Sequence, residues 1–176
     1  MSMETLAPLP VAIPLLLATL LAGLGNVLPR RAADVIATAG ALAVCVICCV
    51  LACGSAHGPV VYWFGGWQPG QAAAGHVFPM GICFIADPLG AGLAALVALL
   101  MFASLLFSWS FFDTVKAYFH AVMLVFRAAM GGLCLTGDLF NRFVWCELMT
   151  AAGVTLCGYK SDQTGPLQGA LNFGVA

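Results

Sequence analysis

The sequence predicts an all-α integral membrane protein with five complete transmembrane helices, the start of a sixth, and a small external β-hairpin between the second and third helices. Hydrophobic residues make up 62% of the 176 residues and charged residues only 7%, whereas about a quarter of the residues in a soluble domain are charged. Apolar runs long enough to cross a bilayer recur, since roughly 20 residues at ~1.5 Å each span a ~30 Å hydrocarbon core. The basic residues between these runs fall in alternate loops. We therefore expect a single transmembrane domain over residues 1–176.

The first two helices are expected at about residues 8–28 and 35–56. The first apolar run is free of charge and no basic residue precedes it, so it fits a retained helix better than a secretory signal. A proline ends this run ahead of Arg30 and Arg31. The second run follows Asp34, whose carboxylate we expect to act as the N-cap and accept hydrogen bonds from backbone N–H groups.

After the second helix the chain becomes richer in glycine, proline and aromatic residues. Residues 60–64 (VVYWF), followed by two glycines, predict a strand that enters a turn, and residues 77–85 predict the returning strand. Tyr62, Trp63 and Trp67 suit the water–lipid interface, where aromatic rings with a polar edge concentrate. Binding of a carbohydrate or a cofactor by these rings is the alternative.

The rest of the chain predicts three more complete helices and the start of another. Asp87 precedes Pro88 in the pattern of an N-cap followed by proline at the first helical position, where its missing N–H does no harm. The last apolar run has ten residues, which is too short to span a bilayer. These helices are expected at residues 88–112, 117–135, 139–159 and, incomplete, 167–176.

The basic loops predict an orientation. Arg30 and Arg31 follow the first helix, Lys116 follows the third, and Lys160 follows the fifth, while the other loops contain no lysine or arginine. Basic loops favour the cytoplasmic side of a membrane. We therefore expect a multi-pass protein of the cell inner (plasma) membrane with its N-terminus and the hairpin outside.

The composition also excludes several functions. Six Lys and Arg against seven Asp and Glu leave no basic surface for nucleic acid. No phosphate loop or nucleophile–base set is found, so a transporter subunit is favoured over an enzyme, and no cofactor is expected. Cys45 and Cys48 have CxxC spacing, yet no second pair completes a metal site. Most cysteines lie in apolar runs and behave as small hydrophobes, with Cys83 left undecided.

Two ionisable residues fall deep in the predicted membrane core. Glu147 lies nine residues after Asp138 and Arg127 eleven residues before it, which places them about 13 and 15 Å below the turn that joins their helices. An intramembrane ion pair between Arg127 and Glu147 is one interpretation, and it would hinder proton transfer unless the pair opened. An unpaired Glu147 would be a ready proton carrier, and intramembrane carboxylates favour ion translocation over a structural role.

His120 and Arg142 lie nearer the ends of their helices. His120 stands at the inner mouth of the fourth helix, where its near-neutral titration makes it a candidate proton relay; an interfacial histidine is the alternative. Arg142 lies four residues after Asp138, so it can pair with that carboxylate or extend its long side chain to the interface.

Several motifs carry a family resemblance. Residues 120–126 (HAVMLVF), 135–141 (LTGDLFN) and 143–148 (FVWCEL) resemble the antiporter-like membrane subunits shared by respiratory complex I and multisubunit cation/proton antiporters, most of all the Mrp-type D subunit. Residues 61–67 (VYWFGGW) and 86–89 (ADPL) are similar to the external hairpin and third helix of that family. Arg127 and Arg142 depart from the pattern, in which apolar residues are usual.

The resemblance implies that Glu147 works with a lysine on a later, broken helix to move protons. Family members are much longer and contain inverted repeats, so we expect this chain to be the N-terminal part of a larger subunit. The implied partners are the lipid bilayer, other membrane subunits of a hetero-oligomeric assembly, protons and Na⁺.

Three functional hypotheses follow. The first is a proton-translocating subunit of a multisubunit Na⁺/H⁺ antiporter. The second is the homologous proton-pumping subunit of an NADH:quinone oxidoreductase or membrane hydrogenase, in which case the chain would be part of a translocase enzyme. The third is a truncated membrane scaffold that moves no ions.

Overall fold

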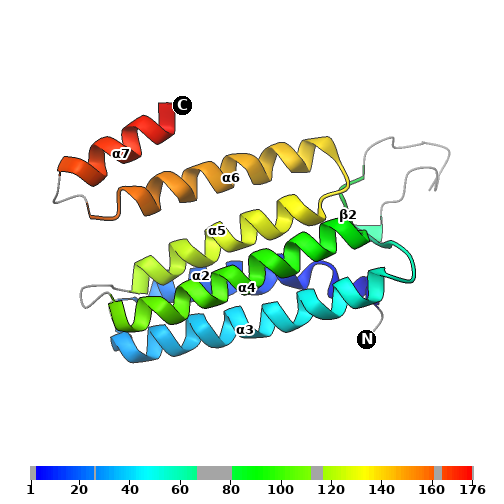
Figure 1. Cartoon of the computed structure of the whole chain (residues 1–176), viewed down its shortest axis with the longest axis horizontal. Coiled ribbons are helices and arrows are strands. Elements are labelled where there is room, and N and C mark those ends of the chain that lie inside the picture. The colour runs from blue at the N-terminus through cyan, green and yellow to red at the C-terminus, as the bar shows by residue number, and fades with distance from the viewer. Residues whose placement is uncertain (1–2, 26, 67–80, 112–116, 161–163, 176) are drawn as a thin grey trace.

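Five long helices lie side by side and alternate in direction in the computed structural model, which describes residues 3–25, 27–66, 81–111, 117–160 and 164–175 (Figure 1). Two shorter helices flank them, one near each end of the chain. The helices are α1 (Met3–Leu6), α2 (Leu9–Leu24), α3 (Arg30–Ser55), α4 (Pro88–Phe111), α5 (Ala117–Leu135), α6 (Leu139–Cys157) and α7 (Thr164–Val175).

A helix lies at each expected position, and several boundaries differ from the expected ones. The first expected helix, at about 8–28, is α2, which ends at Leu24, and the short helix α1 precedes it. The second begins at Arg30 rather than at residue 35, because Pro29 has the extended backbone of an N-cap (φ −65°, ψ 145°). The expectation that Asp34 caps this helix is therefore wrong, since Asp34 lies one turn inside it. The last helix, α7, begins at Thr164, three residues earlier than expected.

The expected hairpin is present between α3 and α4. Strand β1 (Val60–Trp63) pairs antiparallel with β2 (Cys83–Ala86), and Val60 lies opposite Ala86. Beyond β1, Gly65 and Gly66 both have positive φ, which suits the turn expected at these two glycines. Of the expected returning strand at 77–85, the structure shows β2 from Cys83 onward, and residues 81–82 are not in a strand. Residues 77–80, like Trp67, lie outside the described residues.

Four helical segments of the described chain are long and apolar enough to cross a membrane: Met3–Leu24, Arg30–Ser55, Pro88–Trp109 and Ala117–Leu135. The helix α6 has 19 residues, but Asn141, Arg142 and Glu147 lower its hydropathy, and it is not among the four. The expected count of five spans is therefore not confirmed.

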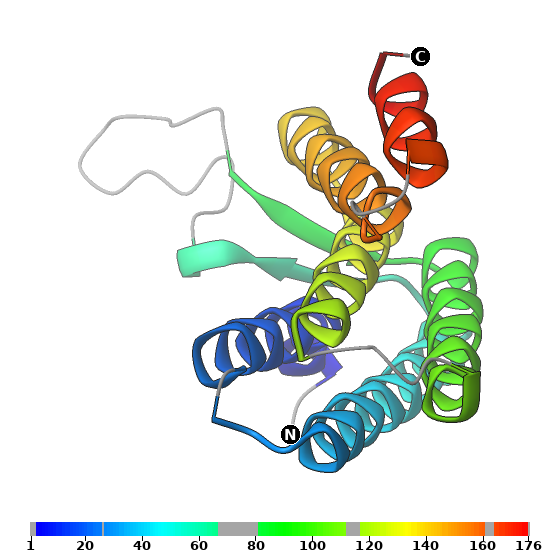
Figure 2. The same ribbon diagram turned by 90° about the vertical axis from the view of Figure 1, so that its left-hand side faces the viewer.

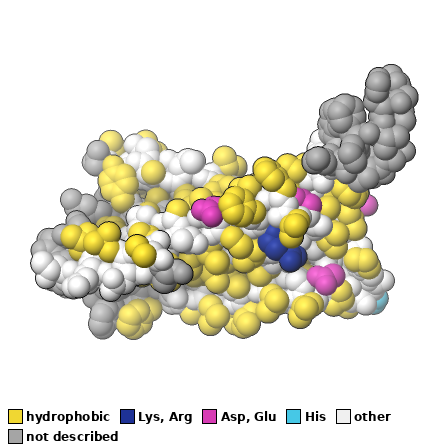
Figure 3. All heavy atoms as spheres, turned by 90° about the horizontal axis from the view of Figure 1, so that it is seen from above, with side chains coloured by type: hydrophobic (Ala, Val, Ile, Leu, Met, Phe, Trp, Pro, Cys, Tyr) yellow, Lys and Arg dark blue, Asp and Glu magenta, His cyan; other side chains and the backbone are white. Residues whose placement is uncertain are grey.

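Helix α5 occupies the centre of the bundle and contacts α2, α3, α4 and α6 (Figure 2). Small buried residues permit this close packing, among them Ala128, Gly131 and Gly132. A Cβ at Gly132 would lie only 2.5 Å from the indole of Trp145 on α6. The helices α6 and α7 lie together on one side of the bundle, and the face seen in Figure 3 is mainly hydrophobic with isolated charged side chains.

The two ends of the bundle differ, because one carries basic residues and the other carries the hairpin. Helix α3 begins, α5 begins and α6 ends at one end, while the N-terminus and the hairpin lie at the other (Figure 1). Arg30, Arg31 and Lys160 therefore share one end of the bundle. We refer to it as the basic end, and to the opposite one as the hairpin end.

Candidate functional site

Glu147 lies in the middle of α6 with an exposed side chain. Among the described residues it has no hydrogen bond or ion pair. Large apolar side chains around it on α6 are also exposed, including Leu139, Phe140, Phe143 and Val144. The carboxylate therefore lies on an open apolar face of the bundle.

Arg127 is buried at the centre of the bundle, with only 1% of its surface exposed. Its Nη1 donates a hydrogen bond of 2.5 Å to the backbone carbonyl of Pro10 on α2, and its Nη2 lies 3.5 Å from the Sγ of Cys48 on α3. One arginine from α5 thus joins three helices.

The carbonyl of Pro10 is available to Arg127 because of the sequence of α2. In a regular helix this carbonyl would accept a hydrogen bond from the N–H of residue 14. That residue is Pro14, which has no N–H. Arg127 therefore supplies the donor that Pro14 cannot. Gly131 lies beside this contact, and a Cβ there would be in ordinary van der Waals contact with Nη1, at 3.5 Å.

The structure does not bring Arg127 and Glu147 together. Phe126 faces α6, because a Cβ at Gly153 would lie 3.7 Å from its ring. One residue further along a helix turns the side chain by about 100°, so Arg127 points toward α2 and α3 instead. No ion pair joins Arg127 and Glu147 in the described structure. The arrangement matches the second of the two interpretations, in which Glu147 is unpaired.

His120 contacts Asp34, which the sequence suggests only as a helix cap. Its Nε2 lies 2.5 Å from the Oδ1 of Asp34 on α3, and both side chains are buried. The other oxygen of Asp34 lies 3.9 Å from the Nε of Arg30. The Oγ1 of Thr38 donates to the carbonyl of Asp34 and accepts from the indole N–H of Trp109. These residues form a polar cluster at the basic end of the bundle.

The sequence did contain a signal for this pair. Asp34 lies four residues after the start of α3 and His120 three residues after the start of α5. Both helices begin at the basic end (Figure 1), so the two side chains have similar depths. The match in depth depends on α3 beginning at Arg30, because a helix beginning at residue 35 would make Asp34 its N-cap.

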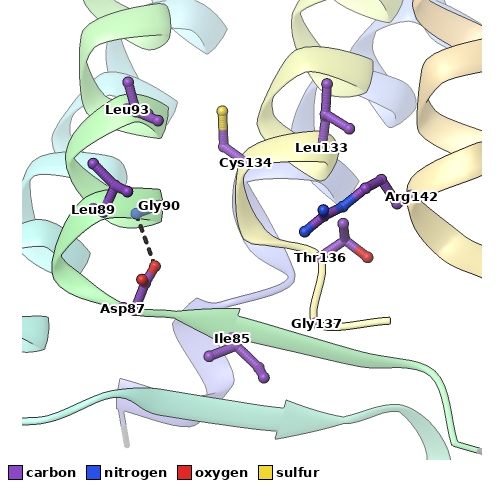
Figure 4. Close-up of a pocket in the computed structure, with 10 residues that line it drawn as sticks. All are labelled: Ile85, Asp87, Leu89, Gly90, Leu93, Leu133, Cys134, Thr136, Gly137 and Arg142. Carbon is purple, nitrogen blue, oxygen red and sulfur yellow. Dashed lines mark hydrogen bonds between the residues drawn. The ribbon is translucent and has the colours of Figure 1, made fainter. Parts of the chain in front are cut away.

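A pocket of about 540 Å³ opens at the hairpin end between α4, α5 and β2. Figure 4 shows the side chain of Arg142 extending into this pocket from α6, near Thr136.

The two aspartates near the pocket cap helices. The carboxylate of Asp87 accepts a hydrogen bond of 2.8 Å from the backbone N–H of Gly90, which confirms Asp87 as a helix cap. The carboxylate of Asp138 caps α6 by accepting a hydrogen bond from the backbone N–H of Asn141. No ion pair joins Asp138 to Arg142 within the described chain.

Cys83 lies in β2 near this pocket. It is buried, and burial raises the pKa of its thiol above the ordinary value, with a further contribution from the nearby carboxylate of Asp138. The thiol is therefore a poor nucleophile at neutral pH. All eight cysteines are free, and no group of three His, Cys, Asp or Glu side chains within the described ranges could hold a metal ion.

A bundle of long apolar helices with ionisable side chains on and between them defines a multi-pass membrane protein. Comparison with known proteins shows which multi-pass membrane proteins the chain resembles. The chain is 31% identical over 172 residues to a Rhizobium meliloti protein described as the D subunit of a probable K⁺/H⁺ antiporter, covering 94% of this chain and 30% of that protein. No protein-family model matches the chain.

Two further relatives point to the same class. The N subunit of the NADH-quinone oxidoreductase of Desulforudis audaxviator is 32% identical over 105 residues, covering 57% of this chain and 19% of that protein. The D subunit of the Na⁺/H⁺ antiporter of Alkalihalophilus pseudofirmus is 30% identical over 102 residues, with the same coverage of 57% and 19%.

Solved structures share the fold. A chain of the Mrp complex from a Dietzia species superposes with a TM-score of 0.75 at 27% identity, covering 89% of this chain and 28% of that one. A chain of the membrane-bound sulfane sulfur reductase, an archaeal respiratory membrane complex, has a TM-score of 0.84 at 21% identity, covering 98% and 34%. The second likeness shows the fold alone.

The homologues of the chain are thus D subunits of cation/proton antiporters and the N subunit of an NADH-quinone oxidoreductase. The chain spans between 19% and 30% of the length of these curated relatives. The resemblance identified from the sequence is thus confirmed.

Proposed function

We propose that this chain forms part of a proton-translocating subunit of a multisubunit cation/proton antiporter, in which Glu147 carries the proton. The observation that carries the proposal is the 31% identity over 94% of the chain with a protein described as an antiporter D subunit. Other membrane subunits of the same assembly are its partners, and Na⁺ is the favoured coupling ion. The relatives are named for K⁺ and for Na⁺, so both cations belong in the assay.

The position of Glu147 supports its role. A carboxylate on an otherwise apolar helix face costs several kcal/mol if it faces lipid, so such groups lie toward protein or a water-filled path. Glu147 is exposed among Phe140, Phe143 and Val144. We infer that protein covers this face of α6 in the assembled complex, and that the proton reaches Glu147 there.

We propose that the protein lies in the plasma membrane. In the proposed orientation the basic end of the bundle faces the cytoplasm. Arg30, Arg31 and Lys160 gather at that end, and basic residues favour the cytoplasmic side. The hairpin and the N-terminus then face outward.

Transport by the reconstituted complex tests the role of Glu147. Proteoliposomes containing the intact subunit and its partners should couple a Na⁺ or K⁺ gradient to proton movement. The substitution Glu147→Gln removes the titratable group while keeping its size, and should reduce this movement at least tenfold. Glu4→Gln makes the same chemical change on an exposed residue of α1 and should leave transport unchanged. Equal transport by Glu147→Gln and wild type would overturn the proposal.

A subunit of a redox-driven complex is the second candidate. The observation that favours it is the 32% identity with the N subunit of an NADH-quinone oxidoreductase. An antiporter moves protons when only a cation gradient is present, whereas a redox-driven complex requires an electron donor and acceptor. Proton movement that appears only with electron transfer would select the second candidate, and movement in neither assay would select a scaffold.

A further inference from the structure

We propose that Asp34 and His120 form a proton-binding site at the basic end of the bundle, with the Nδ1 of His120 as the atom that takes up the proton. The site joins α3 to α5. Its use in transport rests on the proposed function, whereas proton binding by the pair does not.

The geometry of the pair fixes where a proton is already held. Nε2 of His120 and Oδ1 of Asp34 are 2.5 Å apart, and such a short contact requires a hydrogen between the two atoms. A neutral imidazole with its hydrogen on Nε2 has an unprotonated Nδ1 with a free lone pair. The imidazole therefore donates to the carboxylate and keeps its second nitrogen open.

Nδ1 is the unusual atom of this pair. His120 is 1% exposed, and Nδ1 is buried without a hydrogen-bond partner among the described residues. A buried polar atom without a partner costs about 1–3 kcal/mol. The cost is understandable if Nδ1 has to accept and release a proton, because a permanent hydrogen bond would block that exchange.

Among the residues that the structure describes, few charged groups surround the imidazole. Helices α2 and α4 pack against α5 and contain no ionisable side chain. From α3 come the carboxylate of Asp34 and, behind it, Arg30 at 3.9 Å. The ring of Phe119 lies edge-on to His120 and also contacts the ring of Tyr159. An imidazolium formed by proton uptake would thus be stabilised by Asp34 and opposed by Arg30.

An open pocket reaches the site from the basic end. It has a volume of about 360 Å³ and is lined by Arg30, Arg31, Asp34, Val35 and Trp109. Water in this pocket can contact the carboxylate of Asp34. The side chain of Asp34 therefore lies between the buried imidazole of His120 and bulk solvent. Proton exchange is therefore expected with this side of the membrane and not with the hairpin end.

The protonation of His120 can be measured without any transport assay. The protein is labelled with ¹⁵N-histidine in lipid nanodiscs, and His57→Gln and His76→Gln leave His120 as its single histidine. We expect ¹⁵N NMR to show a hydrogen on Nε2 and a bare Nδ1 at pH 9, and hydrogens on both nitrogens as the pH falls to 5. A ring that keeps one protonation state from pH 5 to 9 would overturn the proposal.

Variants of the neighbouring charges identify the partner. Asp34→Asn removes the acceptor of the Nε2 hydrogen and should reduce the fraction of imidazolium at pH 5 at least threefold. Arg30→Gln removes the opposing cation and should increase that fraction, which gives a second result if Asp34→Asn does not fold. Glu4→Gln, in α1 near the hairpin end, is the control and should change nothing.

The failure of this proposal differs from the failure of the proposed function. Identical titrations of His120 in wild type, Asp34→Asn and Arg30→Gln would refute the site, even if Glu147→Gln abolished transport. A titrating pair in a complex whose transport ignores Glu147→Gln would refute only the proposed function.

Discussion

Nη1 of Arg127 donates a hydrogen bond of 2.5 Å to the carbonyl of Pro10, the carbonyl that Pro14 leaves without a helical donor. The proline in α2 and the arginine in α5 therefore complement each other. A buried arginine and a mid-helix proline are each costly alone, whereas together they satisfy a backbone group in the centre of the bundle.

A double-mutant cycle should reveal this dependence. Pro14→Ala provides the missing N–H, so the Pro10 carbonyl no longer needs Arg127. Arg127→Met should therefore be less destabilising in the Pro14→Ala background than in wild type, by about 0.5–3 kcal/mol, the usual coupling between contacting residues. The free energy of unfolding in nanodiscs measures this difference.

The difference between backgrounds is the informative quantity, because Arg127→Met also relieves the desolvation of a buried cation. That contribution is common to both backgrounds and cancels in the cycle. Arg142→Met removes an exposed arginine of α6 and should show no coupling to Pro14→Ala. Additive effects of Arg127→Met and Pro14→Ala would contradict the dependence.

The second prediction concerns the protonation of Glu147. Because Arg127 binds Pro10 and Cys48, removing its charge should leave Glu147 almost unaffected. The carboxyl infrared bands of Glu147, assigned by their loss in Glu147→Gln, should titrate alike in wild type and Arg127→Ala. A shift of more than about one pH unit, worth about 1.4 kcal/mol, would show that the two charges interact after all.

The helices could be predicted because lipid burial depends mainly on composition, which is visible in a single sequence. The partners of the buried charges were harder to predict. A search for opposite charges at equal depth proposes Arg127 with Glu147, but the acceptor that Arg127 uses is a backbone carbonyl. Only the mid-helix Pro14 signals that carbonyl. For Asp34 the obstacle was a helix boundary, because a start at Arg30 turns an apparent cap into a buried side chain.

The third prediction concerns the close contact of α5 and α6. A Cβ at Gly132 would lie 2.5 Å from two atoms of the Trp145 ring, and Phe84 lies beyond that ring with a centroid separation of 6.3 Å. Gly132→Ala should therefore destabilise the protein by about 1–3 kcal/mol, the usual cost of overpacking. Thermal unfolding in nanodiscs measures it.

The matched control for this prediction is Gly92→Ala in α4, where nothing lies within 4 Å of the new Cβ. It should leave the unfolding temperature unchanged or raise it slightly, because alanine favours helix. Trp145→Phe has a smaller ring and should recover part of the stability lost in Gly132→Ala. If Gly132→Ala behaves like Gly92→Ala, the two helices are not in close contact at this point.

The last prediction concerns Cys83 at the hairpin end. Burial and the carboxylate of Asp138 both disfavour the thiolate and raise the pKa of Cys83, so little thiolate is present at pH 8. Asp138→Asn removes the charge while keeping a good N-cap residue, which lowers this pKa and increases the thiolate fraction. Alkylation of Cys83 by N-ethylmaleimide at pH 8, followed by peptide mass spectrometry, should be at least twofold faster in Asp138→Asn.

Two comparisons separate this electrostatic effect from a change in access. At a pH well above the thiol pKa, wild type and Asp138→Asn should react at similar rates, because both are then fully ionised. Asp87→Asn makes the same exchange at the cap of α4 and should leave the rate at pH 8 unchanged. A rate increase of equal size at every pH would instead mean that Asp138→Asn loosens the hairpin around Cys83, since greater access multiplies the reaction rate of the thiolate by the same factor at every pH.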